Sequence, residues 1–114
     1  MAKTILVVDD SKIVLDIIQC VLTSAGYDVV RASGGNPAIE VFAGRPIDLA
    51  LVDINMPGMD GYTLTRTIRQ DPQLARLPII MVTTEAEARD KQQGFDAGAN
   101  AYIVKPIEPE EMLT

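Results

Sequence analysis

Short apolar runs rich in β-branched residues recur along the chain and alternate with longer stretches of mixed character. Most positions within each run are apolar in succession, which is the pattern of strands covered on both faces rather than on one. The runs occupy residues 5–8, 29–30, 47–52, 79–82 and 103–104. This pattern predicts five buried strands.

The segment that follows the first run has the spacing of an amphipathic helix. Ser11 is a favourable N-cap residue, and Gly26 is a favourable residue for ending the helix. Cys20 lies between them and is interpreted as a core residue of this helix. Apolar pairs recur every four residues and are expected to face the core: Ile13 and Val14, Ile17 and Ile18, Val21 and Leu22.

Three more helices are expected between the second predicted strand and the fifth. Asn36 and Pro37 are predicted to be the cap and the first residue of the second helix, and Asp60 is predicted to cap the third. A fourth helix over residues 84–97 is thinly apolar and should be loosely held. Only five residues follow Pro109, so the final helix is predicted to be truncated.

Strands that alternate with helices indicate βαβ units. We therefore predict an α/β protein with a parallel sheet, helices on both faces and right-handed crossovers. The length of 114 residues fits one domain, and no segment has the composition of a linker. A single domain over residues 1–114 is expected.

The composition of the chain excludes several kinds of catalytic and binding site. Histidine is absent, which excludes imidazole general-base catalysis and a phosphohistidine on this chain. Sixteen acidic residues against ten basic ones give a net charge of −6, which argues against direct nucleic-acid binding. A single cysteine excludes an internal disulfide, and no apolar run approaches the ~20 residues of a membrane-spanning helix. We expect a cytoplasmic location and no contact with a membrane.

Polar residues follow four of the predicted strands. Ligands of an open parallel sheet bind beyond the carboxyl ends of its strands. Asp9 and Asp10 follow the first run, and Asp53 follows the third. Thr83 follows the fourth and Lys105 the fifth. Each aspartate alone is more often a cap or a turn former, a threonine is an ordinary strand residue, and a lone lysine is usually solvated. Together they predict a site on one rim of the sheet.

Three ionised carboxylates at one rim repel one another. Two unit charges about 4 Å apart repel by roughly 1 kcal/mol in bulk water and by about 4 kcal/mol at an effective dielectric near 20. A cation in the cluster removes this cost. Because neither histidine nor a cysteine cluster is available, the ligands would be oxygens, which favours Mg²⁺, with Mn²⁺ possible. A cation beside a lysine and a hydroxyl is suited to holding a phosphoryl group.

Four segments resemble motifs of the receiver domain of bacterial two-component response regulators, a family that includes chemotaxis regulators. They are residues 5–11, 52–61, 81–83 and 102–106, and the resemblance runs from residue 3 to residue 106. The resemblance implies a flavodoxin-like, doubly wound fold with a five-stranded sheet in the order 2-1-3-4-5.

The resemblance also implies roles for individual residues. Asp53 would be the phosphoacceptor, a carboxylate nucleophile that becomes an aspartyl phosphate. Asp10 and Asp53 would bind Mg²⁺ directly, Asp9 would bind it mainly through water, and Asn55 would contribute its backbone carbonyl.

The remaining roles concern the phosphoryl group and its lifetime. Lys105 would neutralise phosphoryl charge. Thr83 would turn its hydroxyl towards a phosphoryl oxygen, and Tyr102 would change rotamer as Thr83 moves. We further hypothesise that three residues near the mouth of the site restrict the attacking water and set the phosphoryl lifetime: Asn55, Thr84 and Glu85.

The implied function is a signalling switch rather than an enzyme. The domain would take a phosphoryl group from a sensor histidine kinase or a phosphotransfer protein and catalyse only its own phosphorylation and dephosphorylation. The surface around the fourth helix and fifth strand would then change its affinity for a downstream protein or effector domain.

Three other functions deserve comparison. A phosphatase of the haloacid-dehalogenase type would need Asp-x-Asp after the first strand, whereas Asp9 and Asp10 are adjacent. A flavodoxin-like cofactor binder would need a Gly/Ser/Thr-rich phosphate loop at that place. A receiver-like interaction module that is never phosphorylated stays open as the main alternative.

Overall fold

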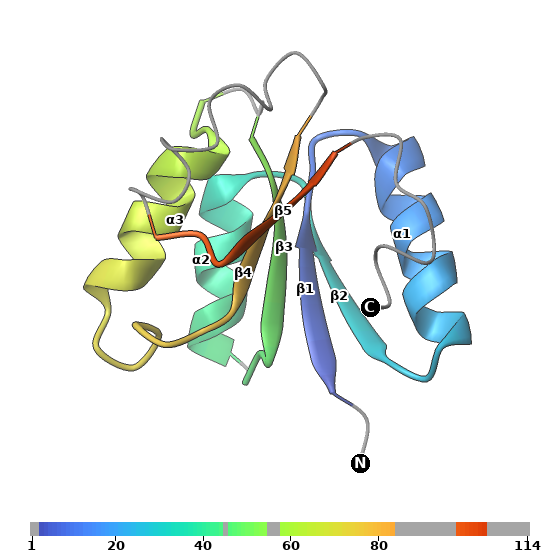
Figure 1. Ribbon diagram of the computed structural model, residues 1–114, viewed down its shortest axis with the longest axis horizontal. Helices are drawn as coiled ribbons and strands as arrows, with labels where there is room; N and C mark the ends of the chain where they lie inside the picture. Colours follow the sequence, from blue (N-terminus) through green and yellow to red (C-terminus); the bar gives the residue numbers. More distant parts are fainter. Residues whose placement is uncertain (1–2, 45, 55–57, 84–97, 105–114) are drawn as a thin grey trace.

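The computed structural model describes residues 3–44, 46–54, 58–83 and 98–104. Its strands form one parallel sheet in the order β2-β1-β3-β4-β5 (Figure 1). The strands are β1 (Thr4–Val8), β2 (Asp28–Ala32), β3 (Leu49–Asp53), β4 (Ile79–Thr83) and β5 (Ala101–Val104), and the helices are α1 (Lys12–Ser24), α2 (Gly35–Gly44) and α3 (Gly61–Gln70). The prediction of an α/β protein built on a parallel sheet is confirmed.

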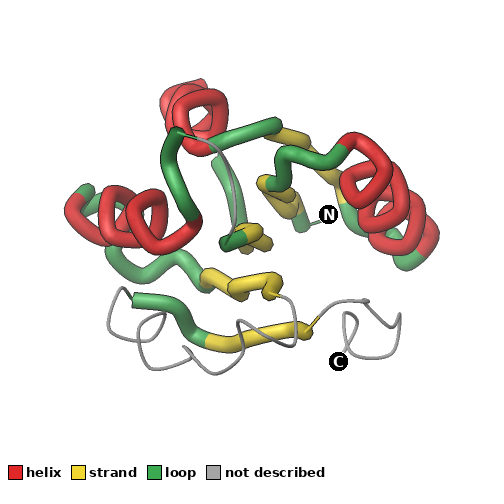
Figure 2. The backbone as a smooth tube through the Cα atoms, turned by 90° about the horizontal axis from the view of Figure 1, so that it is seen from above, coloured by secondary structure: helices red, strands yellow, loops and turns green. Residues whose placement is uncertain are grey.

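Successive side chains of the central strands point to opposite faces of the sheet, and helices cover both faces. Leu6 and Val8 of β1 pack in the cluster shared with α2 and α3. Ile5 and Val7 pack in the cluster shared with α1. Figure 2 shows α1 on one side of the sheet and the other two helices on the opposite side. Both faces of β1 are therefore buried, which explains its unbroken apolar run.

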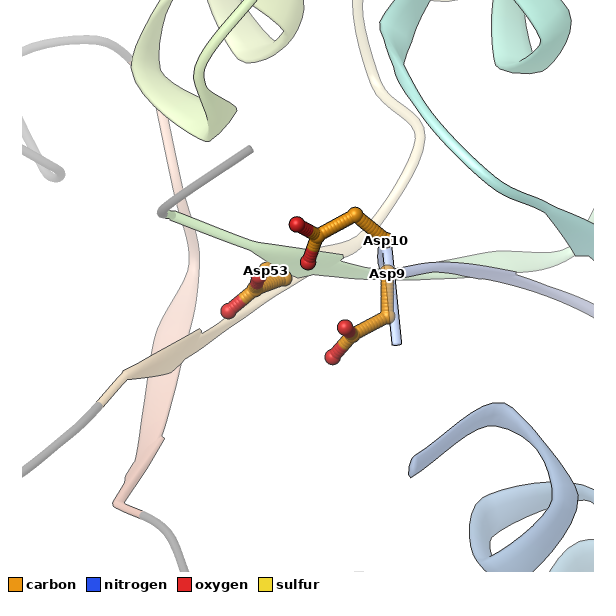
Figure 3. A group of neighbouring side chains, drawn as sticks. All are labelled: Asp9, Asp10 and Asp53. Atoms are coloured by element: carbon orange, nitrogen blue, oxygen red, sulfur yellow. The ribbon is translucent and has the colours of Figure 1, made fainter. Parts of the chain in front are cut away.

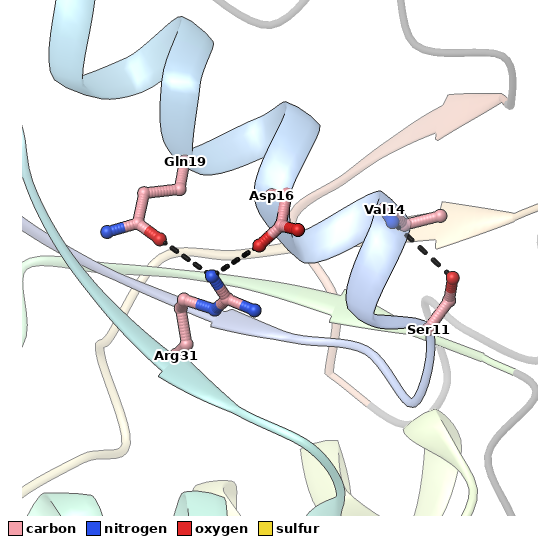
Figure 4. Close-up of polar contacts among 5 residues, drawn as sticks. All are labelled: Ser11, Val14, Asp16, Gln19 and Arg31. Carbon is pink, nitrogen blue, oxygen red and sulfur yellow. Dashed lines mark hydrogen bonds and ion pairs between the residues drawn. The ribbon is translucent and has the colours of Figure 1, made fainter.

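Helix α1 begins and ends where its sequence predicts. The Ser11 hydroxyl accepts a hydrogen bond from the Val14 N–H at 3.4 Å, so Ser11 is the N-cap (Figure 4). The chain leaves the helix through Gly26, whose φ of +97° lies in the left-handed region that glycine tolerates best.

One polar contact fastens α1 to the sheet edge. The Arg31 guanidinium of β2 donates to the Asp16 carboxylate at 2.6 Å and to the Gln19 side-chain oxygen at 3.0 Å (Figure 4). Because the ion pair is solvent-exposed, it contributes at most about 1 kcal/mol to stability.

The predicted core face of α1 is wrong in part. Leu15, Ile18 and Leu22 are buried, whereas Ile13 and Ile17 are 71% and 54% exposed. A helix turns by about 100° per residue, so both members of an adjacent apolar pair cannot lie at the centre of one buried stripe. The interpretation of the single cysteine, Cys20, as a core residue is also wrong, because its side chain is exposed.

Helix α2 starts earlier than predicted. Its range begins at Gly35, and the Ala38 N–H already donates to the Gly34 carbonyl at 3.1 Å. Asn36 is therefore not the cap, and Pro37 lies later in the first turn than its predicted first position. Proline fits there because the first N–H groups of a helix have no intrahelical acceptor, so its missing N–H costs nothing.

Helix α3 begins as predicted. The Asp60 carboxylate accepts a hydrogen bond from the Thr63 N–H at 2.8 Å and caps the helix. Strand boundaries differ from the apolar runs at their ends, since β2 extends over Asp28–Ala32 and β3 starts at Leu49 rather than at Ile47. The expected fourth helix and the truncated last helix lie outside the described residues.

Candidate functional site

The carboxyl ends of β1 and β3 bring the predicted acidic residues together. The two strands are parallel neighbours, and Val8 of β1 is in register with Val52 of β3. Asp9 and Asp10 follow β1 directly, and Asp53 is the last residue of β3. The same register that pairs the strands thus places all three acidic residues at one edge of the sheet.

The three carboxylates form one compact group (Figure 3). One oxygen of each side chain lies within 4.8 Å of the corresponding oxygens of the other two. Asp9 and Asp53 are only 2% and 3% exposed, whereas Asp10 is exposed to solvent. Two of the three acidic residues are therefore buried, and the group is open to solvent at Asp10.

The start of α1 fixes the Asp9 side chain. Its carboxylate accepts a hydrogen bond from the Ser11 N–H at 2.9 Å, and its own N–H donates to the Ala32 carbonyl at 3.1 Å. Ser11 is in turn the N-cap of α1. The residue that begins the helix thus also orients an acidic side chain of the site.

The Asp53 backbone is held by neighbouring elements. Asp53 pairs with Val82 in the register of β3 with β4. The next residue, Ile54, donates its N–H to the Val82 carbonyl at 3.3 Å, and its own carbonyl accepts from the Gly61 N–H at 2.9 Å. Asp53 is therefore positioned both by the sheet and by the first residue of α3.

The donor set suits a hard divalent cation. Three unit charges within 4.8 Å of one another repel by about 3–4 kcal/mol per pair at an effective dielectric near 20, and by less where Asp10 meets water. Carboxylate oxygens are the ligands that Mg²⁺ and Mn²⁺ prefer, and Mg²⁺ usually keeps several waters. The exposed side of the group leaves solvent access for such waters.

Two other predicted site residues are placed by their backbones. Thr83 is the last residue of β4 and is in register with Val104. It lies one residue beyond Val82, the partner of Asp53, and therefore at the same edge of the sheet. Tyr102 lies within β5, in register with Met81. Four predicted site residues lie outside the described residues: Asn55, Thr84, Glu85 and Lys105.

A glycine to which the sequence pattern assigned no role lies against the backbone of Asp53. A Cβ at Gly61 would lie inside van der Waals contact with the Asp53 carbonyl oxygen and 2.9 Å from the Ile54 Cα. The available signal was a glycine directly after the capping aspartate, at a position where helix propensity alone favours other residues. Only the folded structure shows what the missing side chain avoids.

The fold and the site together define a doubly wound α/β protein with an oxygen-only acidic site at the carboxyl ends of its central strands. The family model of the response regulator receiver domain matches residues 5–114. The chain therefore belongs to the response regulator receiver domain family.

Three relatives illustrate the similarity. RpaA of Synechocystis sp., a DNA-binding dual master transcriptional regulator, is 38% identical over 96% of this chain and 45% of its own length. A crystal structure described as a response regulator from Chloroflexus aurantiacus has a TM-score of 0.95 and 41% identity, covering 99% of this chain and 93% of that one. The receiver domain of the Pseudomonas aeruginosa sensor histidine kinase PA1611, with a magnesium ion coordinated in its active-site cleft, has a TM-score of 0.90 and 33% identity, covering 99% and 93%.

Two further findings bear on the whole protein. The chain spans about half the length of the curated relatives that it matches. Within the part of the chain that the structure describes, no helix has the length and apolar character needed to cross a bilayer.

Proposed function

We propose that this chain forms one receiver domain that accepts a phosphoryl group on Asp53 and acts as a switch in a two-component phosphorelay. The observation that carries the proposal is the group of three carboxylates, with oxygens within 4.8 Å of one another, at the strand ends of a receiver fold. Mg²⁺ would be held directly by Asp10, Asp53 and the Asn55 carbonyl, and through water by Asp9. When bound, the ion supplies positive charge against the carboxylates and the phosphoryl oxygens.

The transfer step needs little beyond positioning and charge neutralisation. A carboxylate oxygen of Asp53 attacks the phosphorus of a phosphohistidine on the donor protein. The phosphorus–nitrogen bond breaks as the new phosphorus–oxygen bond forms, and the donor imidazole leaves and takes up a proton from solvent. Water later attacks the phosphorus, the bond to the Asp53 oxygen breaks, and carboxylate and inorganic phosphate are released. Lys105 would neutralise the phosphoryl charge in both steps.

The switch would run from Asp53 through the adjacent strand. Thr83 lies at the same sheet edge, one residue beyond the register partner of Asp53, so its hydroxyl is the group proposed to move towards the phosphoryl oxygens. Tyr102 on the next strand would follow it and change the surface around β5 and the helix expected before it. Coupling of this kind is typically worth 1–3 kcal/mol.

Partner contacts are proposed on α1 and beyond this chain. Ile13 and Ile17 are exposed on the helix that starts beside Asp9 and Asp10, which supports α1 as the contact for a histidine kinase or phosphotransfer protein. The output would come from a downstream protein or effector domain, in the cytoplasm. The net charge of −6 supports the proposal that this domain does not itself bind nucleic acid.

The test is uptake of a phosphoryl group from a small donor. The protein is incubated with acetyl phosphate and Mg²⁺, and its intact mass is measured. We expect a gain of one phosphoryl group that disappears in Asp53→Asn and when EDTA removes the metal. Modification that persists in Asp53→Asn would contradict the assignment. An unmodified wild-type protein would instead favour the interaction module, and turnover of a small phosphate ester would favour the phosphatase.

A further inference from the structure

We infer that Gly61 is a positioning residue for the acidic site, because the absence of its side chain allows the first turn of α3 to rest directly on the backbone of Asp53. The inference deepens the proposed function and rests on it. Gly61 touches no reacting atom and acts only through the residue that it supports.

The three atoms nearest to a Cβ at Gly61 all belong to the backbone. A Cβ there would meet the Asp53 carbonyl oxygen at less than contact distance, the Ile54 Cα at 2.9 Å and the Asp53 carbonyl carbon at 3.1 Å. Gly35 is a useful contrast, because the three atoms nearest to a Cβ at that position all belong to the side chain of Met59. A methionine side chain can rotate away, whereas the end of β3 cannot.

Both partners of this contact are held in place. The Gly61 N–H donates to the Ile54 carbonyl at 2.9 Å, and the Gly61 carbonyl accepts from the buried Thr65 hydroxyl at 2.8 Å. On the other side, the Ile54 N–H donates to the Val82 carbonyl of β4. A side chain at residue 61 must therefore displace the start of α3, the end of β3, or both.

The displacement required is large for a site of this kind. Ordinary van der Waals contact begins near 3.4 Å, so the separation from the Ile54 Cα must grow by 0.5 Å and that from the Asp53 carbonyl oxygen by more. Functional groups must be held within about 0.5 Å of their productive positions. A misplacement of about 1 Å costs about 100-fold in rate.

Backbone conformation does not explain this glycine. Among the described glycines, the positive φ angles belong to Gly26, Gly58 and Gly98, and Gly61 is not one of them. Alanine also has a higher helix propensity than glycine. The local helix therefore accepts alanine at residue 61, and the contact with Asp53 is what opposes it.

The experiment compares Gly61→Ala with two controls. Gly44→Ala adds the same methyl group at the last residue of α2, where a Cβ meets nothing within 4 Å. Ile68→Val removes a methyl group from a buried residue near the opposite end of α3 from Gly61 and lowers stability. For each protein we measure cooperative urea unfolding, Mn²⁺ affinity by calorimetry, and the rate of phosphoryl uptake from acetyl phosphate at saturating Mg²⁺.

We expect Gly61→Ala to remain folded, to bind Mn²⁺ at least 10-fold more weakly, and to take up phosphoryl groups about 10- to 100-fold more slowly. Gly44→Ala and Ile68→Val should stay within twofold of the wild type in Mn²⁺ affinity and in the rate of phosphoryl uptake. Two results overturn the inference: wild-type metal affinity and rate in Gly61→Ala, or loss of its folded state, which would show a role in the fold as a whole. A wild-type protein that takes up neither Mn²⁺ nor phosphoryl groups would instead contradict the proposed function.

Discussion

Removing the exposed carboxylate of the site should stabilise the metal-free protein. In Asp10→Asn, one of three negative charges whose oxygens lie within 4.8 Å of one another is lost. Among the described residues, no hydrogen bond to the Asp10 carboxylate is present that the substitution would break. The change therefore removes repulsion without leaving a described polar group unsatisfied.

The magnitude follows from Coulomb's law. Because Asp10 is solvent-exposed, the water-like limit applies, and each of its two repulsive pairs costs about 1 kcal/mol. Salt screens part of this energy. We expect the free energy of unfolding of Asp10→Asn to exceed that of the wild type by about 1–2 kcal/mol in EDTA and at low ionic strength.

Bound Mg²⁺ should reverse the order of stability of the wild type and Asp10→Asn. A ligand that binds only the folded state stabilises it by RT ln(1 + [L]/Kd). Millimolar Mg²⁺ should therefore raise the free energy of unfolding of the wild type and have little effect on Asp10→Asn, which lacks the proposed direct ligand.

The assay is urea unfolding followed by circular dichroism, with EDTA and with Mg²⁺. Asp28→Asn is the matched control, because it removes the same charge from an exposed residue at the start of β2, the opposite end of the sheet from the site. The control should gain as much from Mg²⁺ as the wild type does. Two results would contradict this prediction: Asp10→Asn less stable than the wild type in EDTA, or Asp10→Asn stabilised by Mg²⁺ as much as the wild type.

Three further predictions concern other parts of the molecule. The Arg69 guanidinium donates to the carbonyls of Leu77 and Gly98 and to the Asn100 side chain, so Arg69→Met should lower the free energy of unfolding by about 2–3 kcal/mol. A loss below about 0.5 kcal/mol, as for an ordinary surface change, would show that these hydrogen bonds contribute little. Ile17→Ser should leave urea unfolding and acetyl phosphate uptake unchanged while slowing phosphoryl transfer from the partner kinase, and equal slowing with both donors would argue against a docking role. Thr84→Ala should change the decay rate of the phosphorylated protein, measured by intact mass over time, and an unchanged rate would remove Thr84 from the residues that set the lifetime.

Local signals in the sequence predicted helix starts better than helix faces. Ser11 and Asp60 were recognisable as caps because an N-cap bonds to an N–H only three residues away. The face of α1 was predicted less well, because adjacent apolar pairs do not reveal which member meets the sheet. Ile13 and Ile17 are the members left exposed.

The site was predictable to the extent that it is made by strand ends. Asp9, Asp10 and Asp53 follow apolar runs, and parallel strands bring such residues to one edge. The role of Gly61 was not predictable, because its contact is with the backbone of Asp53, eight residues earlier in the chain. A sequence pattern does not reveal the distance between such backbone atoms, because strand register and helix packing determine that distance.

The most direct test of Asp53 as the phosphoacceptor is to locate the phosphoryl group itself. The protein is treated with acetyl phosphate and Mg²⁺, the acyl phosphate is reduced with borohydride to homoserine, and the modified residue is found by peptide mass spectrometry. We predict homoserine at residue 53 and nowhere else, with none formed when EDTA is present. Homoserine at another aspartate, or its formation without metal, would contradict the assignment of Asp53.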